Sequence, residues 1–455
     1  MTRKSTSQEA VGVSEPIKTA DLAIVMPERD PEIEYEDWTT EVLSPAKAFY
    51  ATTSTGPNED QPSYDSAMKG PEAPQWKQGL QSEYDSLIER KVWTLVPTPQ
   101  HAKIFQPKWV LQRKRNENNE VVRHKARLVL RGYEQVPGRD YGETYAPTVR
   151  SETSRLLLSL AAKHDWECDQ LDAVTAFLNS KVDRQIYMWQ PNGFPKEPGK
   201  VCLLNLALYG MKQSAKLWAD TNATGLQSIG YTKSKYDDAL WFRRTDRTYV
   251  TTHVDDFKVY ASNRQIMDAA KQQIMSLFPM KDLGPIRFYL GMKVDRNREM
   301  RTIQITQTAA IDRILDEAKL TNCSPCQTPM EHGLQLEGAK EPSQIVDQKT
   351  YAHLNGRLLH LAMNTRPDIA FVVSRLAQHT TTPNSQCWAA LKRLIRYLKG
   401  TRTKGIIYGI QPNPATTDDD TCHIKGYTDS DWAGDLSTCR SISGYLFFGA
   451  EVPIA

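Results

Sequence analysis

Residues 249–261, with the sequence YVTTHVDDFKVYA, constrain the fold more than any other stretch of the chain. Two runs rich in Val, Thr, Tyr and Phe flank adjacent acids, which predicts two short strands with Asp255 and Asp256 at the turn between them. Adjacent carboxylates repel each other, and Asn-Gly or Asp-Gly serves a merely solvated turn equally well, so the pair favours a bound divalent cation. For this stretch taken alone, a solvated hairpin turn is the alternative.

The length and composition are those of a globular protein. A chain of 455 residues has room for two to four domains, since a single hydrophobic core seldom grows past roughly 250 to 300 residues. The longest apolar run, RLLLSLAA, is far too short to cross a membrane, so no membrane is expected as a partner. The polar N-terminus lacks the apolar core of a secretory signal, so we expect an intracellular protein with reduced cysteines.

The net charge of +3 is divided unevenly along the chain. Residues 1–75 hold six Lys/Arg and fourteen Asp/Glu, which leaves a net charge of +11 on the remainder. Because residues 1–74 also lack a sustained helical or strand period, we expect them to form a disordered acidic leader. A basic remainder is typical of a protein that binds a polyanion, although ordinary solvated surfaces also carry a diffuse positive excess.

The first folded elements are expected within residues 76–132. Five apolar residues at helical spacing predict an amphipathic helix over 76–91 that faces the core. They are Trp76, Leu80, Tyr84, Leu87 and Ile88. A strand over 92–96 and a hairpin from KWVLQRKR and VVRHKARLVLRG follow. Ten Lys/Arg against three Glu over 103–139 suit this hairpin to hold phosphates, with a solvated basic edge strand as the alternative.

A second candidate acid, Asp172, lies in WECDQLDAVTAFLN, beyond a helix predicted over 151–164 with Ser151 as its cap. Asp172 ends a predicted strand that turns directly into a short helix, a suitable place for a metal together with an anionic ligand. A helix cap is the alternative interpretation. The 83 residues from Asp172 to Asp255 leave room for their two strands to become neighbours in one antiparallel sheet with helices behind it.

Between these acids, IYMWQPNGF predicts a hairpin, and LNLALYGMKQSAKLW predicts a loop that enters a helix. For Lys212 at that junction, the alternative to a functional role is that of an ordinary solvated lysine. Further on, ALKRLIRYLKGT predicts a basic amphipathic helix that either lies along a nucleic-acid backbone or presents a solvated face. Cys323 and Cys326 have a metal-like spacing, but one such pair is half a zinc site at best.

Ten blocks in one order closely resemble the reverse transcriptase region of copia-type LTR retrotransposon polyproteins. They include RHKARLVLRGYEQVPGRDYGETYAPTV, QLDAVTAFLNS, LALYGMKQS, HVDD, MKDLGPIRFYLGMKV, TRPDIAFVVSRLAQ and GYTDSDWAGD. Short acidic motifs recur by chance, whereas ten blocks in the family's order do not. The resemblance extends from about Trp76 to the C-terminus.

The resemblance implies an α+β fold of the right-hand polymerase type, with fingers, a palm built on an antiparallel sheet, a thumb, and a truncated ribonuclease H-like hairpin. The implied divisions are a leader over 1–74, fingers and palm over 75–300, thumb or connection over 301–411, and a linker with the start of a ribonuclease H domain over 412–455. Asp429 matches the first catalytic position of that domain. The family's remaining acids belong further on, so ribonuclease H activity is not expected from this chain.

The resemblance also implies the chemistry, an RNA-directed DNA polymerase that transfers nucleotides from dNTPs to a primer 3′-hydroxyl with two Mg²⁺ ions, or Mn²⁺ as a substitute. Catalytic and metal-binding roles fall on Asp172, Asp255 and Asp256, the first two as direct ligands. Oxygen ligands suit Mg²⁺, and a two-metal site stabilises in-line transfer. Substrate-binding roles fall on Lys125, Arg127, Phe177, Tyr209, Gly210, Lys212, Gln213 and Lys281. Phe177 matches the aromatic residue that excludes a ribose 2′-hydroxyl.

Implied partners are an RNA template, a DNA primer, an RNA–DNA hybrid, dNTPs, and the integrase or ribonuclease H parts of the same polyprotein. The implied location is cytoplasmic, in virus-like particles, and nuclear. Three departures from the family pattern are His253 in place of Tyr, Ala173 in place of Val, and Ala215 in place of Pro. They raise an alternative function, a non-catalytic nucleic-acid-binding relic of a decayed retrotransposon. His253 either hydrogen-bonds a primer backbone or fills space.

Overall fold

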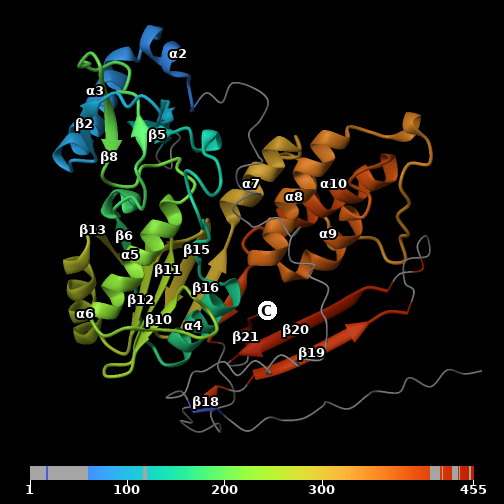
Figure 1. Cartoon of the computed structure of the whole chain (residues 1–455). Helices are drawn as coiled ribbons and strands as arrows, with labels where there is room; N and C mark the ends of the chain where they lie inside the picture. The colour runs from blue at the N-terminus through green and yellow to red at the C-terminus, as the bar shows by residue number, and fades with distance from the viewer. Residues whose placement is uncertain are drawn as a thin grey trace, which may run out of the picture.

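A computed structural model describes residues 17–18, 60–115, 120–409, 421–422, 424–432, 439, 441–449 and 452–454. These residues form an α+β fold of several sheets and a separate group of helices (Figure 1). The linker expected at the start of 412–455 and most of the expected leader lie outside the described residues. Within the described part of the chain, no helix is long and apolar enough to cross a membrane.

A six-stranded antiparallel sheet, here called the central sheet, organises the middle of the chain. Its strands in spatial order are β13 (Met280–Pro285), β6 (Glu167–Ala173), β12 (Asp256–Ala261), β11 (Thr248–His253), β10 (Leu240–Arg243) and β9 (Thr232–Lys233). Helices α5 (Ser214–Ser228) and α6 (Arg264–Leu277) bury apolar residues against one face. Successive side chains of a strand point to opposite faces, so this apolar layer occupies only alternate positions.

The other face of the central sheet packs on α4 (Ser151–Lys163) and on a four-stranded antiparallel sheet. That sheet consists of β14 (Phe288–Tyr289), β15 (Met292–Asn297), β16 (Thr302–Thr306) and β17 (Ile406–Tyr408). The prediction that Ser151 caps α4 is wrong. Arg150 occupies the cap position without a side-chain hydrogen bond, and Ser151 is the first helical residue.

The hairpin predicted around the paired acids is confirmed, with one shift. Strands β11 and β12 pair in register, and His253 lies opposite Asp256. The turn therefore consists of Val254 and Asp255. Asp256 is already the first residue of β12 and is paired with His253 of β11 on one side and with Asp172 of β6 on the other. The two acids differ in environment because only one of them belongs to the turn.

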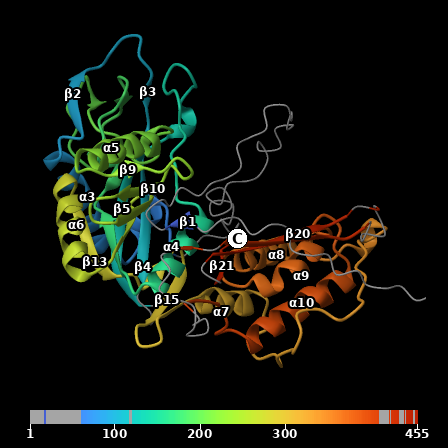
Figure 2. The same ribbon diagram turned by 90° about the horizontal axis from the view of Figure 1, so that it is seen from below.

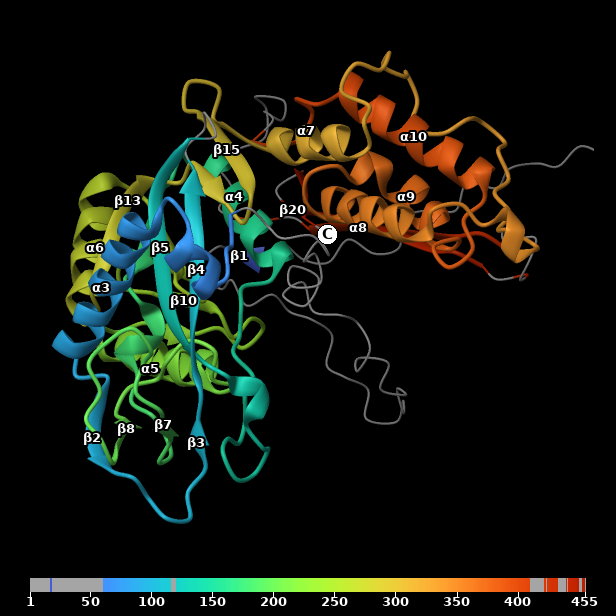
Figure 3. The same cartoon turned by 90° about the horizontal axis from the view of Figure 1, so that it is seen from above.

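The basic hairpin is also confirmed, as β4 (Pro107–Arg115) and β5 (Val121–Leu130), and it packs on α3 (Ala73–Glu89) (Figure 3). Helix α3 buries Trp76, Leu80 and Leu87 as predicted. Ile88, however, is 47% exposed, because it lies at the C-terminal end of the helix and next to the turn that leads into the next strand.

The folded part begins before residue 75, so the leader boundary at 74 is too late. Helix α2 (Tyr64–Lys69) is capped by Ser63, whose hydroxyl accepts a hydrogen bond from the Ser66 amide at 3.2 Å. Ala67 is buried in the same apolar cluster as α3. Residues of low average hydrophobicity are ordered here because the neighbouring helix supplies the surface that they cover.

A mixed four-stranded sheet completes this end of the chain. Its strands in spatial order are β2 (Trp93–Pro97), β8 (Lys200–Leu204), β7 (Tyr187–Met188) and β3 (Ile104–Phe105). The stretch IYMWQPNGF does not form a hairpin by itself, since it contributes only β7. The antiparallel partner of β7 is β8, further along the chain, and its other neighbour β3 is parallel.

Residues 308–400 form a group of helices around their own apolar core. The long helices are α7 (Thr308–Glu317), α8 (Gln348–Asn364), α9 (Ala370–Ala377) and α10 (Ser385–Gly400). Helix α10 contains the predicted basic helix, but its cations have internal partners. Arg393 contacts Glu331, Arg396 donates to the Ser324 carbonyl, and Lys399 donates to the carbonyls of Thr321 and Cys323. Lys392 is exposed, and whether this face lies along a nucleic-acid backbone stays a prediction.

The last described residues form a small sheet of β19 (Ile424–Ser430), β20 (Ser443–Gly449) and β21 (Val452–Pro453), which runs beside the helices (Figures 1 and 2). Tyr445, Leu446 and Phe447 of β20 are exposed, so apolar side chains lie open on both faces of this sheet. Its end docks on the body. Val452 and Ile454 are buried, and the Ser159 hydroxyl donates to the Gly449 carbonyl at 3.1 Å. A further two-stranded pairing joins β1 (Ile17–Lys18) to β18 (Thr421–Cys422).

Candidate active site

Three aspartates meet at one end of the central sheet. Strands β6 and β12 are antiparallel neighbours, and Asp172 lies directly opposite Asp256 in their register. Asp255 is tied to the same place, because its carbonyl accepts a hydrogen bond from the Ala173 amide at 2.7 Å. Positions 172 and 256 are 84 residues apart in sequence, yet the sheet brings their carboxyl groups to one edge.

The electrostatics of this edge show an excess of negative charge. Burial raises the pKa of the Asp172 carboxyl, and the nearby carboxyl groups of Asp255 and Asp256 raise it further. Lys281, which pairs opposite Asp172 on β13, and Lys125 oppose that shift without cancelling it. A carboxylate that repels its neighbours in this way favours a cation between them.

Hard oxygen donors fit Mg²⁺, which commonly binds through one or two carboxylates together with substrate phosphates. Asp172 and Asp255 match that donor set. Among the described residues, no group of three or more His, Cys, Asp or Glu side chains is arranged closely enough to hold a metal ion by itself. The metal-binding role of the three aspartates therefore stays a prediction.

The turn that carries Asp255 is strained. Val254 has φ +58°, a left-handed conformation that a β-branched residue adopts at a cost of roughly 1–3 kcal/mol. Trp218 on α5 holds this turn, since its indole N–H donates to the Val254 carbonyl at 2.6 Å. A helix on the far face of the sheet thus restrains the backbone beside the acids.

Asp256 has two partners within the sheet. The Gln170 amide donates to its Oδ1 at 2.8 Å, and the Lys258 ammonium lies 2.8 Å from its Oδ2. The Lys258 side chain is only 2% exposed and lies 3.5 Å from the centre of the Tyr289 ring. Burial lowers the pKa of Lys258 to about 8, although Asp256 opposes that shift.

His253 lies beside this cluster and is half-buried. Burial and the neighbouring Lys258 charge both lower the pKa of its imidazole. The ring is therefore neutral at physiological pH, which leaves it one N–H donor rather than two. Both interpretations of this residue, a hydrogen bond to a primer or a space-filling ring, remain compatible with that state.

The basic hairpin supplies two cations to the same site. Lys125 and Arg127 alternate with buried residues on β5, and Lys125 is near enough to influence the pKa of Asp172. Burial lowers the pKa of Lys125, and repulsion from Arg127 and from Lys114 contributes. Glu83 on α3 lies against this group, and burial raises the pKa of its carboxyl despite the nearby cations.

Phe177, Tyr209 and Arg127 form a stack between the hairpin and the acids. The Arg127 guanidinium lies 5.1 Å from the centre of the Tyr209 ring, and the ring centres of Tyr209 and Phe177 are 4.8 Å apart. Phe177 belongs to a 3₁₀ helix (Ala176–Asn179) that follows β6 directly, as the sequence predicts for a short helix at this place. The ring of Phe177 is thereby held beside the end of the strand that carries Asp172.

The loop over 209–213 is docked by its backbone. Gly210 has φ +88°, and a Cβ there would lie 2.2 Å from the Leu130 carbonyl, so no larger residue fits. Gln213 is 1% exposed and is hydrogen-bonded to Gln135, to Asp183 and to the Asp140 carbonyl. Lys212 is exposed. The loop thus presents Tyr209 and Lys212, whereas Gly210 and Gln213 fix its position.

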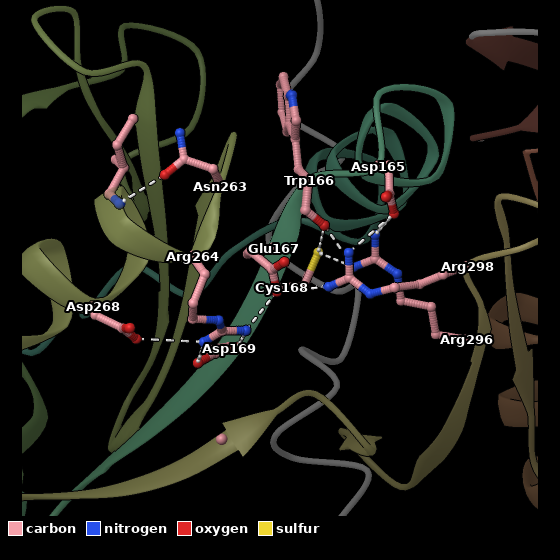
Figure 4. Close-up of polar contacts among 12 residues, drawn as sticks. Asp165, Trp166, Glu167, Cys168, Asp169, Asn263, Arg264, Asp268, Arg296 and Arg298 are labelled. Atoms are coloured by element: carbon pink, nitrogen blue, oxygen red, sulfur yellow. Dashed lines mark hydrogen bonds and ion pairs between the residues drawn. The ribbon is translucent and has the colours of Figure 1, made fainter.

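The opposite face of β6 carries a second cluster of charges, the Asp169 cluster, which sequence reasoning missed (Figure 4). Asp169 is fully buried, and its carboxylate contacts Lys271 at 2.6 Å and Arg264 at 2.7 Å, both from α6. Glu167 on the same strand contacts Arg264 and Arg298. Burial opposes ionisation of Asp169, but the hydrogen bonds from Arg264 and Lys271 outweigh it and lower its pKa.

Asp429 is not part of this constellation. It lies on β19, opposite Gly444 of β20, in the small sheet beside the helices. Its carboxylate is exposed and accepts a hydrogen bond from the Ser430 amide at 3.0 Å. Cys323 and Cys326 are free thiols that pack against the helical core.

Sequence reasoning also missed Lys258, Gln170 and Trp218. The alternation of strand side chains was a usable signal for Lys258, since residues 256 and 258 of one strand must share a face. Gln170 and Asp172 share the same face of β6 for the same reason. Trp218 left no comparable signal, because its contact with Val254 depends on how α5 packs on the sheet.

Comparison with known proteins adds the following findings. The family model described as "Reverse transcriptase (RNA-dependent DNA polymerase)" matches residues 90–332. The chain is 34% identical over 390 residues to the retrovirus-related Pol polyprotein from transposon TNT 1-94 of Nicotiana tabacum, with 84% of this chain and 29% of the relative covered. It is 31% identical to that from transposon RE2 of Arabidopsis thaliana, over 91% of this chain and 28% of the relative.

The chain therefore spans less than a third of the length of these curated relatives. Among solved structures, it is similar to a foamy viral protease-reverse transcriptase in complex with double-stranded DNA. That match has a TM-score of 0.43 and 13% sequence identity, and it covers 83% of this chain and 55% of that chain.

Proposed function

Because this chain belongs to the reverse transcriptase (RNA-dependent DNA polymerase) family of copia-type Pol polyproteins, we propose that it catalyses RNA-directed DNA synthesis. The single observation that carries the proposal is the meeting of Asp172, Asp255 and Asp256 at one edge of the central sheet, where their charges repel. In this proposal the central sheet is the palm, the β4–β5 hairpin belongs to the fingers, and residues 308–400 form the thumb or connection.

The proposed reaction is attack of a primer 3′-hydroxyl on the α-phosphate of a dNTP, which forms a phosphodiester bond, breaks the bond between the α- and β-phosphates and releases pyrophosphate. Asp172 and Asp255 would hold two Mg²⁺ ions, or Mn²⁺ in their place, and these ions supply the charge that activates the hydroxyl and stabilises the transfer. Lys125 and Arg127 bind the triphosphate from the hairpin side, and Lys281 does so from β13. Lys125 and Arg127 are half-buried, and electrostatic contacts with phosphate strengthen in such a medium of lower dielectric constant.

Phe177 selects deoxynucleotides in this proposal. Its ring packs on Tyr209, and Tyr209 in turn lies under the Arg127 guanidinium. A ring fixed from behind cannot withdraw from a ribose 2′-hydroxyl, so a ribonucleotide meets a steric barrier. The same stack links the cation that binds phosphate to the residue that reads the sugar.

The partners follow from the chemistry. An RNA template, a DNA primer and the resulting hybrid present phosphates to the basic hairpin, and affinity for them should fall with salt. Asp429 keeps only a proposed role in a ribonuclease H-like part.

Primer extension tests the proposal. The purified chain is incubated with an RNA template, a labelled DNA primer, dNTPs and Mg²⁺ or Mn²⁺, and the products are sized. Extension that stops without a divalent cation, and that is absent in Asp172→Asn, supports the function. Binding of the primer–template without extension under any metal condition would instead identify a nucleic-acid-binding relic.

A further inference from the structure

The feature that carries a further inference is the buried ammonium of Lys258. Transfer of a charged group out of water costs several kcal/mol unless partners compensate. Lys258 is 2% exposed, and its contacts in the described part of the chain are the Asp256 carboxylate at 2.8 Å and the face of Tyr289 at 3.5 Å. The fold thus keeps a desolvated cation three residues after Asp255.

The second step concerns Asp256. Each of its carboxylate oxygens has a partner, Oδ1 the Gln170 amide and Oδ2 the Lys258 ammonium. Both partners come from inside the sheet, two residues away from Asp172 and Asp256 along β6 and β12, because Lys258 lies opposite Gln170 in the register of these strands. Asp256 is therefore held by its neighbours, whereas the pKa of Asp172 is raised by nearby acids.

The third step concerns Tyr289, which lies in the block FYLGMKV. The Tyr289 hydroxyl and the Ser154 hydroxyl of α4 are 2.6 Å apart. The Lys258 ammonium consequently contacts the Asp256 carboxylate on one side and the Tyr289 ring on the other. Tyr289 is in turn held to α4 by the hydrogen bond with Ser154. Cation–π contacts are strongest for desolvated ammonium groups, so the Tyr289 ring is a substantial partner.

We propose that Lys258 is a positioning residue of the polymerase site, which holds and neutralises Asp256 so that Asp172 and Asp255 remain as the carboxylates that bind the divalent cation. The inference rests on the proposed polymerase function. It predicts that Lys258 acts through Asp256, so that its removal matters only while Asp256 carries a charge.

The test is a double-mutant cycle on the full chain, with Lys258→Met, Asp256→Asn and the combined variant. Free Mn²⁺ is measured by electron paramagnetic resonance to give the metal affinity, and single-turnover extension gives the maximal rate. Lys258→Met should bind Mn²⁺ at least about fivefold more tightly, because the Asp256 carboxylate is no longer neutralised and adds its negative charge to the metal site. Its maximal rate should fall at least about tenfold, because Asp256 is no longer oriented.

In the Asp256→Asn background, Lys258→Met should change neither quantity by more than about twofold. Lys271→Met is the matched control, since it removes the other buried lysine that contacts a buried aspartate of the same sheet. It should change the stability but not the Mn²⁺ affinity of the folded chain. Lys258→Arg, which keeps the charge, should retain Mn²⁺ affinity within about twofold, and Lys258→Gln replaces the Met variant if that one does not fold.

Equal losses of rate and metal affinity from Lys258→Met in both backgrounds would show a merely structural role and overturn the inference. Unchanged Mn²⁺ affinity in Lys258→Met would overturn it as well. Absence of extension by the unmodified chain would count against the proposed function, whereas the metal-binding cycle would still decide the role of Lys258.

Discussion

Strand β6 carries an aspartate on each of its faces, and the two environments differ in their balance of charge. Asp169 faces α6, is fully buried, and is contacted by the cations of Lys271 and Arg264. Asp172, three residues further on, faces Asp255 and Asp256, with Lys281 and Lys125 as more distant cations. The pKa of Asp169 is lowered and that of Asp172 is raised, although burial acts in the same direction on both.

The difference separates a carboxylate that the protein itself compensates from the carboxylate that we propose binds a metal ion. At the Asp169 cluster, each acid is matched by a cation of the chain, so the cluster joins β6 to α6 and, through Glu167 and Arg298, to the segment after β15 (Figure 4). At the edge with Asp172, the chain leaves a charge unmatched, and such frustrated groups are expected where a ligand supplies the compensation. Burial alone does not distinguish the two sites.

The largest expected effect is on catalysis. Asp255→Asn should lower the rate of primer extension at least about a thousandfold, because the carboxylate is needed to neutralise charge in the transition state. Primer–template affinity should stay nearly unchanged, since it comes mainly from Lys and Arg. Single-turnover extension and a filter-binding assay measure the two quantities. A loss of binding as large as the loss of rate would contradict this division.

Asp169→Asn should show the reverse pattern and lower the free energy of unfolding by about 3 kcal/mol. The expected cost is at the low end for a broken buried ion pair, because Lys271 keeps its contact with Asp282 at 2.7 Å. Urea unfolding measures the change. Extension per folded molecule should remain within about threefold of the unmodified chain. A rate loss similar to that of Asp255→Asn would erase the distinction between the two faces.

The comparison extends to aromatic rings. Phe177→Ala should reduce discrimination against ribonucleotides at least about tenfold, with little loss of deoxynucleotide use, because we propose that its ring blocks the ribose 2′-hydroxyl. Phe278→Leu is the control, since that ring packs on Trp218, with 5.0 Å between ring centres, inside the apolar cluster against which Phe177 also packs. Incorporation of single rNTPs and dNTPs gives the ratio. Discrimination that is unchanged in Phe177→Ala would remove this residue from sugar selection.

The smallest expected effect is on the pH dependence of stability. A carboxyl whose pKa is raised in the folded chain destabilises the fold when it ionises, so Asp172→Asn should raise Tm at pH 7 by about 2 °C. The gain should disappear below the unfolded pKa of about 3.9. Asp169 has a lowered pKa, so its stabilisation is present above about pH 3.9 and is lost as the pH falls through the folded value.

Thermal unfolding of both variants and the unmodified chain between pH 3 and pH 8 checks these signs. The two difference curves should diverge as the pH rises, with opposite signs. If Asp172→Asn is less stable than the unmodified chain at pH 7, the negative charge of the three aspartates is already compensated by cations of the protein.

Much of the fold near the site could be predicted from the sequence. The hairpin around Asp255, the strand that ends at Asp172, the basic hairpin with Lys125 and Arg127, and the loop that enters α5 all occur where alternation and turn residues place them. The predictions of secondary structure are wrong where tertiary packing, rather than the local sequence pattern, decides which residues form a helix or a strand. Helix α2 is ordered by its neighbour α3, and IYMWQPNGF finds its strand partners elsewhere in the chain.

The sequence by itself determined which acids and cations alternate onto one face of each strand, because the side-chain period of a strand is two. Only the tertiary structure decided which of these charges are matched. The cations that contact Asp169 come from α6, about a hundred residues along the chain, and Lys258 reaches Asp256 and Tyr289 inside a closed interface. Charge compensation depends on distance and on exclusion of water, and both follow from how helices and sheets pack rather than from spacing along the chain.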